Sequence, residues 1–162
     1  MSPTVSRVSG VKWISDFLRA TARCFRLYAV FRGRAGRSEF WYFLLFFFVG
    51  YAVVIALDMW VDAPVVRLSR LPGGAFIPLA HAMDDVGLLT LLYRPVLFLP
   101  SAAVSVRRLH DVGKNGWWSL LWVLPVPVLG WFVLVPWLLR PSDPHPNAYG
   151  PAPSPRGFAA GG

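Results

Sequence analysis

The sequence RRLHDVGKNG, at residues 107–116, is a charged island between two hydrophobic stretches of the chain. A second charged segment, FRGRAGRSEFW at residues 31–41, opens another hydrophobic stretch. In chain order, we call residues 31–41 the first island and residues 107–116 the second island. Long apolar stretches joined by short charged segments are typical of helices that cross a membrane. The pattern therefore indicates a small integral membrane protein whose unusual chemistry lies at one membrane face.

The composition supports the same class. Of 162 residues, 56% are hydrophobic and only 15% are charged, which is too apolar for an ordinary soluble domain. The length allows a single domain. Because Cys24 is the only cysteine, the chain forms no intramolecular disulfide and no cysteine-based metal site, and we expect no cofactor.

Three stretches are long enough to cross a membrane, since a helix needs about 20 apolar residues for a hydrocarbon core of about 30 Å. We place the spans at about residues 40–60, 86–106 and 117–139. The first carries no charge before Asp58, and the third carries none at all. These spans predict an all-α, three-span membrane domain at residues 40–140, preceded by a cytoplasmic segment at residues 1–39.

Arg94 interrupts the second span, but the uncharged run that follows, at residues 95–106, would reach only about 18 Å without it. We therefore keep Arg94 inside the membrane. The favoured interpretation is that its long stem carries the charge to the interface. The alternative is a polar cavity in which Asp58, Asp84 or Asp85 pairs with the guanidinium.

Basic residues predict the orientation of the chain. With three spans, one side holds eleven of them: Arg7, Lys12, Arg19, Arg23, Arg26, Arg32, Arg34, Arg37, Arg107, Arg108 and Lys114. The other side holds Arg67, Arg70, Arg140 and Arg156. The positive-inside rule then places the N-terminus and both islands in the cytoplasm and the C-terminus outside. Because topology accounts for the net charge of +8, we expect no nucleic-acid binding.

Two segments flank the membrane domain. Residues 11–31 have apolar positions at steps of three and four, with basic residues mainly elsewhere, which predicts an amphipathic helix. We favour a position on the anionic leaflet, and the alternative is packing against the spans. The tail at residues 141–162 is rich in Pro, Gly, Ala and Ser, so we expect it to be disordered.

The predicted topology brings both islands to the same face, where they form a candidate binding cluster for headgroups or a partner. Its members are Arg32, Arg34, Arg37, Glu39, Arg107, Arg108, His110, Asp111 and Lys114. A simpler interpretation is that the basic residues only anchor the helix ends, while Glu39 or Asp111 fixes the packing of the spans. In that case we expect Glu39 to pair with Arg107 or Arg108.

The two islands in this order, followed by NAYGP at residues 147–151, resemble the bacterial inner-membrane family called domain of unknown function 805, the YhaH-like proteins. The resemblance covers about residues 13–151. It implies a small multi-spanning membrane protein of the bacterial inner membrane. Because the biochemical role of that family is not established, the resemblance supplies no reaction.

Catalysis is the weaker hypothesis for the islands. His110 and Asp111 are the residue types of a general base and its partner, but neighbours on a helix project about 100° apart and do not face each other. The chain has no histidine cluster with metal-ligand spacing. We therefore expect neither catalytic nor metal-binding residues, and a membrane-bound enzyme using His110 remains the least favoured alternative.

The favoured function is a non-enzymatic accessory or regulatory membrane component. Its expected partners are anionic phospholipids, with an unidentified membrane protein or a second copy of the chain as further candidates. The main alternative is a subunit of an oligomeric transporter or channel for small solutes, because three helices are too few to enclose a pathway alone.

Overall fold

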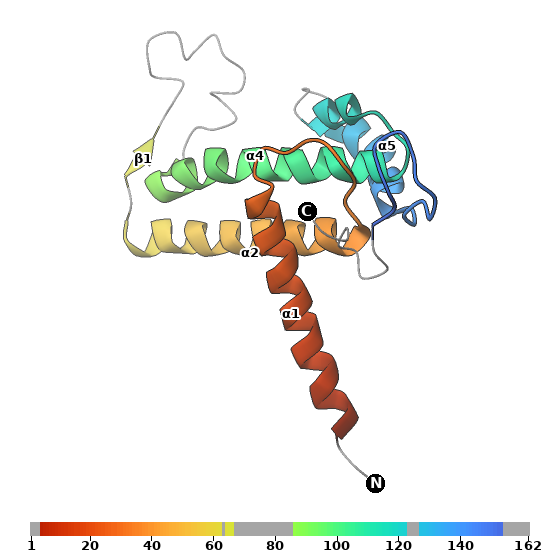
Figure 1. Cartoon of the computed structure of the whole chain (residues 1–162). Helices are drawn as coiled ribbons and strands as arrows, with labels where there is room; N and C mark the ends of the chain where they lie inside the picture. The colour runs from red at the N-terminus through yellow and green to blue at the C-terminus, as the bar shows by residue number, and fades with distance from the viewer. Residues whose placement is uncertain (1–3, 63, 67–85, 123–126, 154–162) are drawn as a thin grey trace. The chain divides into compact units, whose positions relative to one another are not determined.

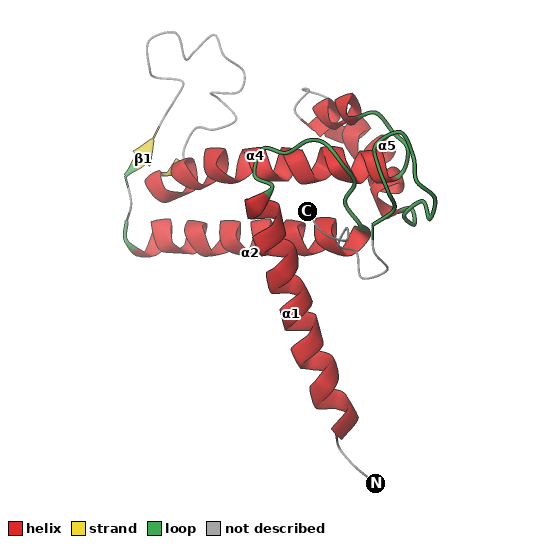
Figure 2. Cartoon of the chain, in the orientation of Figure 1, coloured by secondary structure: helices red, strands yellow, loops and turns green. Residues whose placement is uncertain are grey.

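The computed structural model describes residues 4–62, 64–66, 86–122 and 127–153, in which helices predominate (Figures 1 and 2). The elements are α1 (Thr4–Arg26), α2 (Arg37–Trp60), β1 (Val65–Val66), β2 (Val86–Gly87), α4 (Leu88–Asp111), the 3₁₀ helix η3 (Gly116–Trp122) and α5 (Pro127–Leu139). The two short strands pair antiparallel. The predicted helical class is confirmed, with this small β pair as an addition.

The chain divides into two compact units. One, which we call the island unit, consists of Met1–Leu45 and Leu99–Gly162, and the other, the middle unit, consists of Phe46–Phe98. The long helices α2 and α4 each contribute residues to both units. Both islands belong to the island unit, whereas Arg94 belongs to the middle unit.

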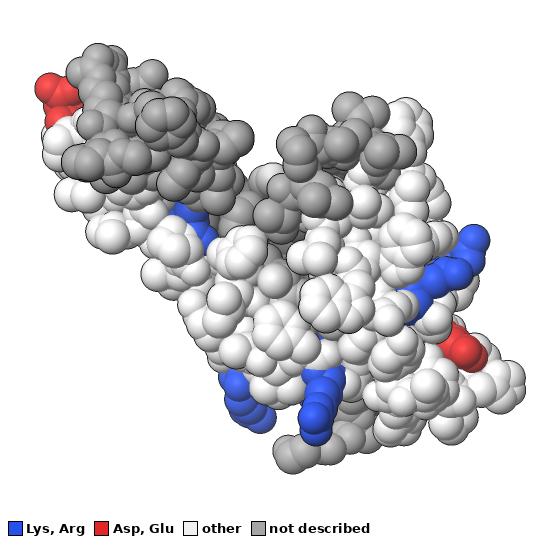
Figure 3. Space-filling view, turned by 90° about the horizontal axis from the view of Figure 1, so that it is seen from above, with Lys and Arg blue, Asp and Glu red and all other residues white. Residues whose placement is uncertain are grey.

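Two helices, α2 and α4, are long and apolar enough to cross a membrane. Each has 24 residues, which corresponds to about 36 Å of helix. They match the first and second predicted spans, although α4 continues to Asp111 and so includes half of the second island. Figure 3 shows a face of the chain on which most of the described surface is neither Lys, Arg, Asp nor Glu, with the charged side chains in separate small groups. A membrane-type protein is therefore plausible from length and composition.

The third predicted span, at residues 117–139, is not one helix. Residues 116–122 form η3 and residues 127–139 form α5, which has 13 residues and reaches only about 20 Å. The rings of Trp118 and Trp137 lie 5.3 Å apart, whereas a continuous helix would separate them by about 28 Å. The two described arms, η3 and α5, therefore pack side by side as a hairpin, which corrects the prediction of one continuous helix over residues 117–139.

Proline and glycine explain this hairpin. Pro127 begins α5, where its missing N–H costs nothing, but the same residue cannot continue a helix from η3. Gly130 lets the two arms approach closely, since an added Cβ would lie 2.9 Å from the Leu121 carbonyl oxygen. The arms of the hairpin are thus in direct backbone contact.

Within the island unit, α1 packs against the first turns of α2. Trp13 and Phe17 each meet the ring of Tyr42 edge-on, and Phe25 meets Phe43 in the same way. However, other large apolar side chains of α1 are exposed, with Leu18 59% exposed. These contacts are compatible with both predicted positions of α1, packed against the spans or lying on the leaflet. One side of the helix packs on the protein, and an apolar side remains exposed.

In the middle unit, Asp58 near the end of α2 caps the start of α4. Its carboxylate accepts hydrogen bonds from the backbone N–H groups of Leu89 at 3.0 Å and Thr90 at 2.8 Å. These donors have no partner within their own helix, so the cap satisfies them. A Cβ at Gly87 would clash with the Asp58 side chain, so glycine permits this approach.

Within the described residues, Arg94 contacts a tyrosine, while both interpretations of its charge, snorkelling and pairing with an acid, stay predictions. Its guanidinium donates to the hydroxyl of Tyr51 and lies 5.5 Å from the centre of the same ring. Asp58 is occupied by the α4 cap, while Asp84 and Asp85 lie outside the described residues. A hydroxyl and an aromatic face thus partly replace water around this charge.

Candidate functional site at the two islands

Glu39, in the first turn of α2, is fully buried between two arginines. Arg107 of α4 places Nη2 3.1 Å from Oε1, and Arg23 of α1 places Nε 3.3 Å from Oε2. We call these three residues the Glu39 cluster. A buried carboxylate is tolerated only with such partners, so the cluster joins three helices at one point. The predicted pair between Glu39 and Arg107 is confirmed.

Arg107 also holds the C-terminal end of α1. Its Nη1 donates to the carbonyl oxygens of Val30 at 2.7 Å and Leu27 at 3.3 Å, just beyond the last residue of that helix. Its own carbonyl accepts the N–H of Ala35 at 3.0 Å. A cation at a helix C-terminus satisfies acceptors that lack helical partners. The second island therefore positions both α1 and the first island.

Cys24 lies beside the same carboxylate, with its thiol 4.0 Å from Glu39 Oε1. Burial, reinforced by the negative charge of Glu39, raises the pKa of the Cys24 thiol from 9.0 to about 12. The thiol therefore stays protonated at neutral pH. Because thiolates are the reactive form, Cys24 acts here as a small packed side chain.

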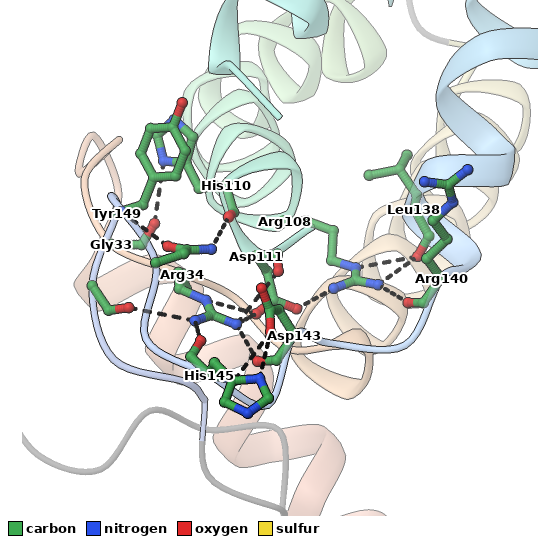
Figure 4. A network of polar contacts seen from close by, with 12 residues as sticks. Gly33, Arg34, Arg108, His110, Asp111, Leu138, Arg140, Asp143, His145 and Tyr149 are labelled. Atoms are coloured by element: carbon green, nitrogen blue, oxygen red, sulfur yellow. Dashed lines mark hydrogen bonds and ion pairs between the residues drawn. The ribbon is translucent and has the colours of Figure 1, made fainter. Parts of the chain in front are cut away.

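Asp111, the last residue of α4, is the second buried carboxylate and also lies between two arginines (Figure 4). Arg34 of the first island approaches Oδ1 with Nη2 at 2.8 Å and Nε at 3.0 Å. Arg108, one helical turn before Asp111, pairs with Oδ2. We call these residues the Asp111 cluster.

Arg108 connects this cluster to the end of the hairpin. Its Nε and Nη2 donate to the Leu138 carbonyl oxygen at 3.1 and 3.0 Å, and Nη2 also donates to the carbonyl oxygen of Arg140 (Figure 4). These carbonyls close α5, where acceptors lack helical partners. Arg107 therefore donates to carbonyls just after the end of α1, and Arg108 does the same at the end of α5.

Arg34 binds the tail in a similar way. Its guanidinium donates to the carbonyl oxygens of Asp143, His145 and Gly150, the second at 2.7 Å (Figure 4). Residues 141–153 therefore have a defined structure, and the predicted disorder is wrong for them. Composition misled the prediction because the tail is held through its backbone carbonyls rather than by apolar side chains. Residues 154–162 lie outside the described chain.

His110 faces away from Asp111. Its Nδ1 lies 3.2 Å from the carbonyl oxygen of Gly33, and its ring stacks on Tyr149 at a centroid distance of 3.9 Å. Asn147 donates to the His110 backbone carbonyl at 2.9 Å. The tail thus covers the histidine, and the imidazole has the contacts of a packed aromatic ring.

These contacts place the tail beside both islands. The N–H of Asp143 donates to the Asp111 carbonyl, and Asn147 reaches the second island, so the chain returns to the face from which the hairpin starts. The described part of the tail therefore lies next to both islands, an observation that bears on the predicted placement of the C-terminus outside. The hairpin of η3 and α5 is the physical reason, because it brings residue 140 back to residue 108.

The nine residues predicted as one cluster divide by exposure. Arg34, Glu39, Arg107, Arg108 and Asp111 are buried, His110 and Lys114 are half-buried, and Arg32 and Arg37 are exposed. Lys114 lies 4.9 Å from the ring centre of Trp137. The buried members are thus committed to internal contacts, which leaves the exposed and half-buried cations for a ligand.

Sequence reasoning missed four contributors to the site. Arg23 completes the Glu39 cluster, Cys24 lines it, and Asn147 and Tyr149 cover His110. A signal for the last two was present, because NAYGP is part of the motif set that carries the family resemblance. Within the residues that the structure describes, no three His, Cys, Asp or Glu side chains are grouped to hold a metal ion.

Comparison with known proteins identifies relatives of this arrangement. The family described as Protein of unknown function (DUF805) matches residues 28–151. Inner membrane protein YhaH of Escherichia coli K12 is 34% identical over 126 residues, covering 78% of this chain and 88% of that protein. Inner membrane protein YhaI of the same strain is 32% identical over 126 residues, covering 78% and 87%.

A further relative, the uncharacterized protein YiiR of the same strain, is 31% identical over 106 residues, or 64% of this chain and 58% of that protein. No solved structure matches the chain. The family match begins after α1 and ends with the last residue of NAYGP, so it spans both islands and the segment that covers His110.

Proposed function

The chain belongs to the DUF805 family of proteins of unknown function, and from that premise we propose that it is a non-enzymatic accessory or regulatory protein of the inner membrane. Its cytoplasmic face binds anionic phospholipid headgroups and so sets where a partner protein docks. The names of YhaH and YhaI, both inner membrane proteins, support the location, and the charge distribution of the islands supports the ligand.

The observation that carries the proposal is the excess of positive charge at the islands. Each cluster has two arginines for one carboxylate, so neither is neutral. Arg32 and Arg37, both exposed in the first island, form no ion pair with any other described residue. A basic residue near an anionic leaflet contributes about 1 kcal/mol to binding. The internal clusters thus hold the first island in place, and its exposed arginines meet the headgroups.

The amphipathic helix α1 fits the same role. Its exposed apolar side chains, Trp13, Ile14 and Leu18, recur at helical spacing and are each at least half exposed. An interfacial helix buries such a face in the headgroup region while its basic residues contact phosphates. The Glu39 cluster ties the other end of α1 to the spans, so lipid contacts along α1 act on the packing of α2 and α4 in the island unit.

For topology, we propose two crossings, by α2 and α4, in place of three. Residues 117–139 enter the membrane as the η3–α5 hairpin and return to the cytoplasmic face. The contacts of the tail with both islands support this arrangement, as does the need to keep an uncharged 23-residue stretch in contact with lipid. The positive-inside rule still orients the islands toward the cytoplasm, now together with Arg140.

Lipid retention tests the headgroup proposal. We would purify the full chain in detergent, add equal amounts of phosphatidylglycerol and phosphatidylcholine, and count bound lipids by native mass spectrometry. The wild type should prefer phosphatidylglycerol. The variant Arg32→Gln/Arg37→Gln should lose about fivefold of that preference per arginine, corresponding to about 1 kcal/mol each.

Arg140→Gln is the matched control, because Arg140 is exposed and basic but lies outside the first island. Its lipid preference should stay within twofold of the wild type. Equal losses in all variants would contradict a site at the first island and indicate diffuse charge attraction. A wild type with no preference for phosphatidylglycerol would contradict headgroup binding altogether.

Reporter fusions test the topology. Green fluorescent protein fused after residue 162 should fluoresce, because it folds in the cytoplasm, and alkaline phosphatase at the same site should be inactive. The opposite result would restore three crossings. A fusion in the loop between α2 and α4 provides the control for the outer side.

A further inference from the structure

The hairpin carries a hollow that neither cluster explains. It has a volume of about 350 Å³ and is lined by Asn115, Trp117, Trp118, Leu120 and Leu121. Apart from Asn115, every lining residue belongs to η3 and is apolar. Trp117 is 75% exposed and Leu120 48% exposed, so the hollow opens to the surroundings of the hairpin. It therefore offers an apolar recess within an uncharged segment.

A cation, Lys114, lies two aromatic contacts away from this recess and directly precedes Asn115 in the chain. Lys114 places Nζ 4.9 Å from the ring centre of Trp137, and that ring meets Trp118 edge-on at 5.3 Å. Trp118 in turn lines the hollow. Lys114 forms no ion pair with another described residue, so its charge is not neutralised within that part of the chain.

Asn115 adds a polar group to the lining of the hollow. Its Oδ1 accepts the N–H of Trp117 at 3.1 Å, which starts η3. This contact uses the oxygen of the amide and orients its NH₂ group away from the helix N–H. An apolar recess thus has one polar lining residue and an unneutralised cation next to that residue in the chain, a combination that suits a phospholipid better than a wholly apolar or wholly ionic ligand.

We propose that this hollow binds one anionic phospholipid, with an acyl chain along Leu120 and Leu121 and the phosphate beside Lys114 and Asn115. The aromatic side chains Trp117 and Trp118 fit the headgroup depth at which such rings gather. The inference rests on the membrane location proposed above. It concerns a different surface from Arg32 and Arg37, so the two can fail separately.

Quenching of tryptophan fluorescence by brominated lipid tests the site. We would reconstitute the full chain in bilayers that contain equal mole fractions of either phosphatidylglycerol or phosphatidylcholine brominated on the acyl chain. The wild type should be quenched more by the brominated phosphatidylglycerol, equivalent to at least threefold local enrichment. Trp117→Phe/Trp118→Phe should remove this excess, because the reporting rings are lost.

Lysine variants separate charge from folding. Lys114→Gln should abolish the excess quenching by phosphatidylglycerol, whereas Lys114→Arg should keep it. Excess quenching that persists in Lys114→Gln, or a wild type quenched equally by both lipids, would overturn the site. The variant Arg140→Gln, at an exposed cation that does not line the hollow, should leave the excess unchanged, and loss in that variant would indicate diffuse charge attraction instead of a site at Lys114.

Discussion

The Glu39 and Asp111 clusters have the same composition but hold different parts of the chain. In each, one buried carboxylate lies between two arginines from different segments. The Glu39 cluster joins three helices, α1, α2 and α4. The Asp111 cluster joins a single helix end to the first island, the hairpin and the tail. The comparison shows one ionic arrangement used both to pack helices and to close irregular backbone.

The difference lies in what the arginines do with their remaining donors. Arg107 also donates hydrogen bonds to two backbone carbonyls near the end of α1. Arg34 and Arg108 together donate to the carbonyls of five residues of α5 and the tail. Irregular backbone has no internal partners for its carbonyls, so it depends on these donors. Loss of Asp111 should therefore disrupt more structure than loss of Glu39.

The largest effect is expected from Asp111→Ala, which leaves two buried guanidinium groups without their carboxylate. Breaking a buried pair from one side costs about 3 to 5 kcal/mol. The free energy of unfolding in detergent should fall by about that amount, and protease should cut the tail. The control is Asp143→Ala, whose half-exposed carboxylate accepts the His145 N–H at 3.0 Å and lies 3.6 Å from the His145 Nδ1, and which should cost about 1 kcal/mol. Similar losses in the two variants would contradict the central role of Asp111.

Glu39→Gln should have a smaller effect, because the volume and one acceptor remain. Replacing a charged acceptor costs about 1.5 to 3 kcal/mol. The structural consequence should be local: trypsin should cut after Arg23 and Arg26 faster, while the tail stays protected. Asp16→Asn on α1 is the control and should leave the cleavage rate unchanged. Release of the tail in Glu39→Gln would show that the two clusters are not separate.

Cys24 reports on the Glu39 cluster without changing it. Its pKa of about 12 in the folded chain exceeds the ordinary 9.0, so folding favours the protonated thiol. This contribution is fully present below pH 9.0 and is lost as the pH rises through about 12. At pH 9.5 the folded protein should react with iodoacetamide at least tenfold more slowly than the unfolded chain. Equal rates would contradict a buried thiol.

The smallest effect is expected at the edge of the Asp111 cluster. Tyr149→Ala removes the ring stacked on His110 and should cost about 0.5 to 1.5 kcal/mol. Hydrogen exchange should quicken in residues 143–150 while α1 stays protected. His145→Ala serves as the control, since its side chain is 85% exposed. Unchanged exchange in Tyr149→Ala would show that the arginine contacts alone hold the tail.

Periodicity and length predicted the helices but not the hairpin. Hydrophobic runs identified α2 and α4, because a crossing helix needs only length and an absence of charge. The same criteria failed at residues 117–139, where Pro127 and Gly130 allow two short arms to pack on each other. A run of apolar residues indicates that a segment lies in lipid or in a protein core. It does not indicate whether the segment runs straight or turns back on itself.

For the candidate site, residue type and predicted topology identified which residues come together. They did not predict which of these residues are buried in ion pairs and which are exposed. Both islands do meet, and Glu39 does pair with Arg107. The division between buried Arg34 and exposed Arg37, three residues apart, could not be predicted because it depends on carbonyls of the tail. The sequence pattern of side chains does not indicate which backbone carbonyls lack a hydrogen-bond donor in the folded chain.

The order of synthesis lets the adjacent arginines of α4 meet their partners at different times. Arg107 binds Leu27, 80 residues earlier, whereas Arg108 binds Leu138, 30 residues later. Because the ribosome delivers the N-terminal part first, α1 waits for the last turn of α4 before its end is secured. The hairpin and tail then close onto Arg108 and Arg34. The contact of Arg107 with the end of α1 can thus form before the contact of Arg108 with the end of α5.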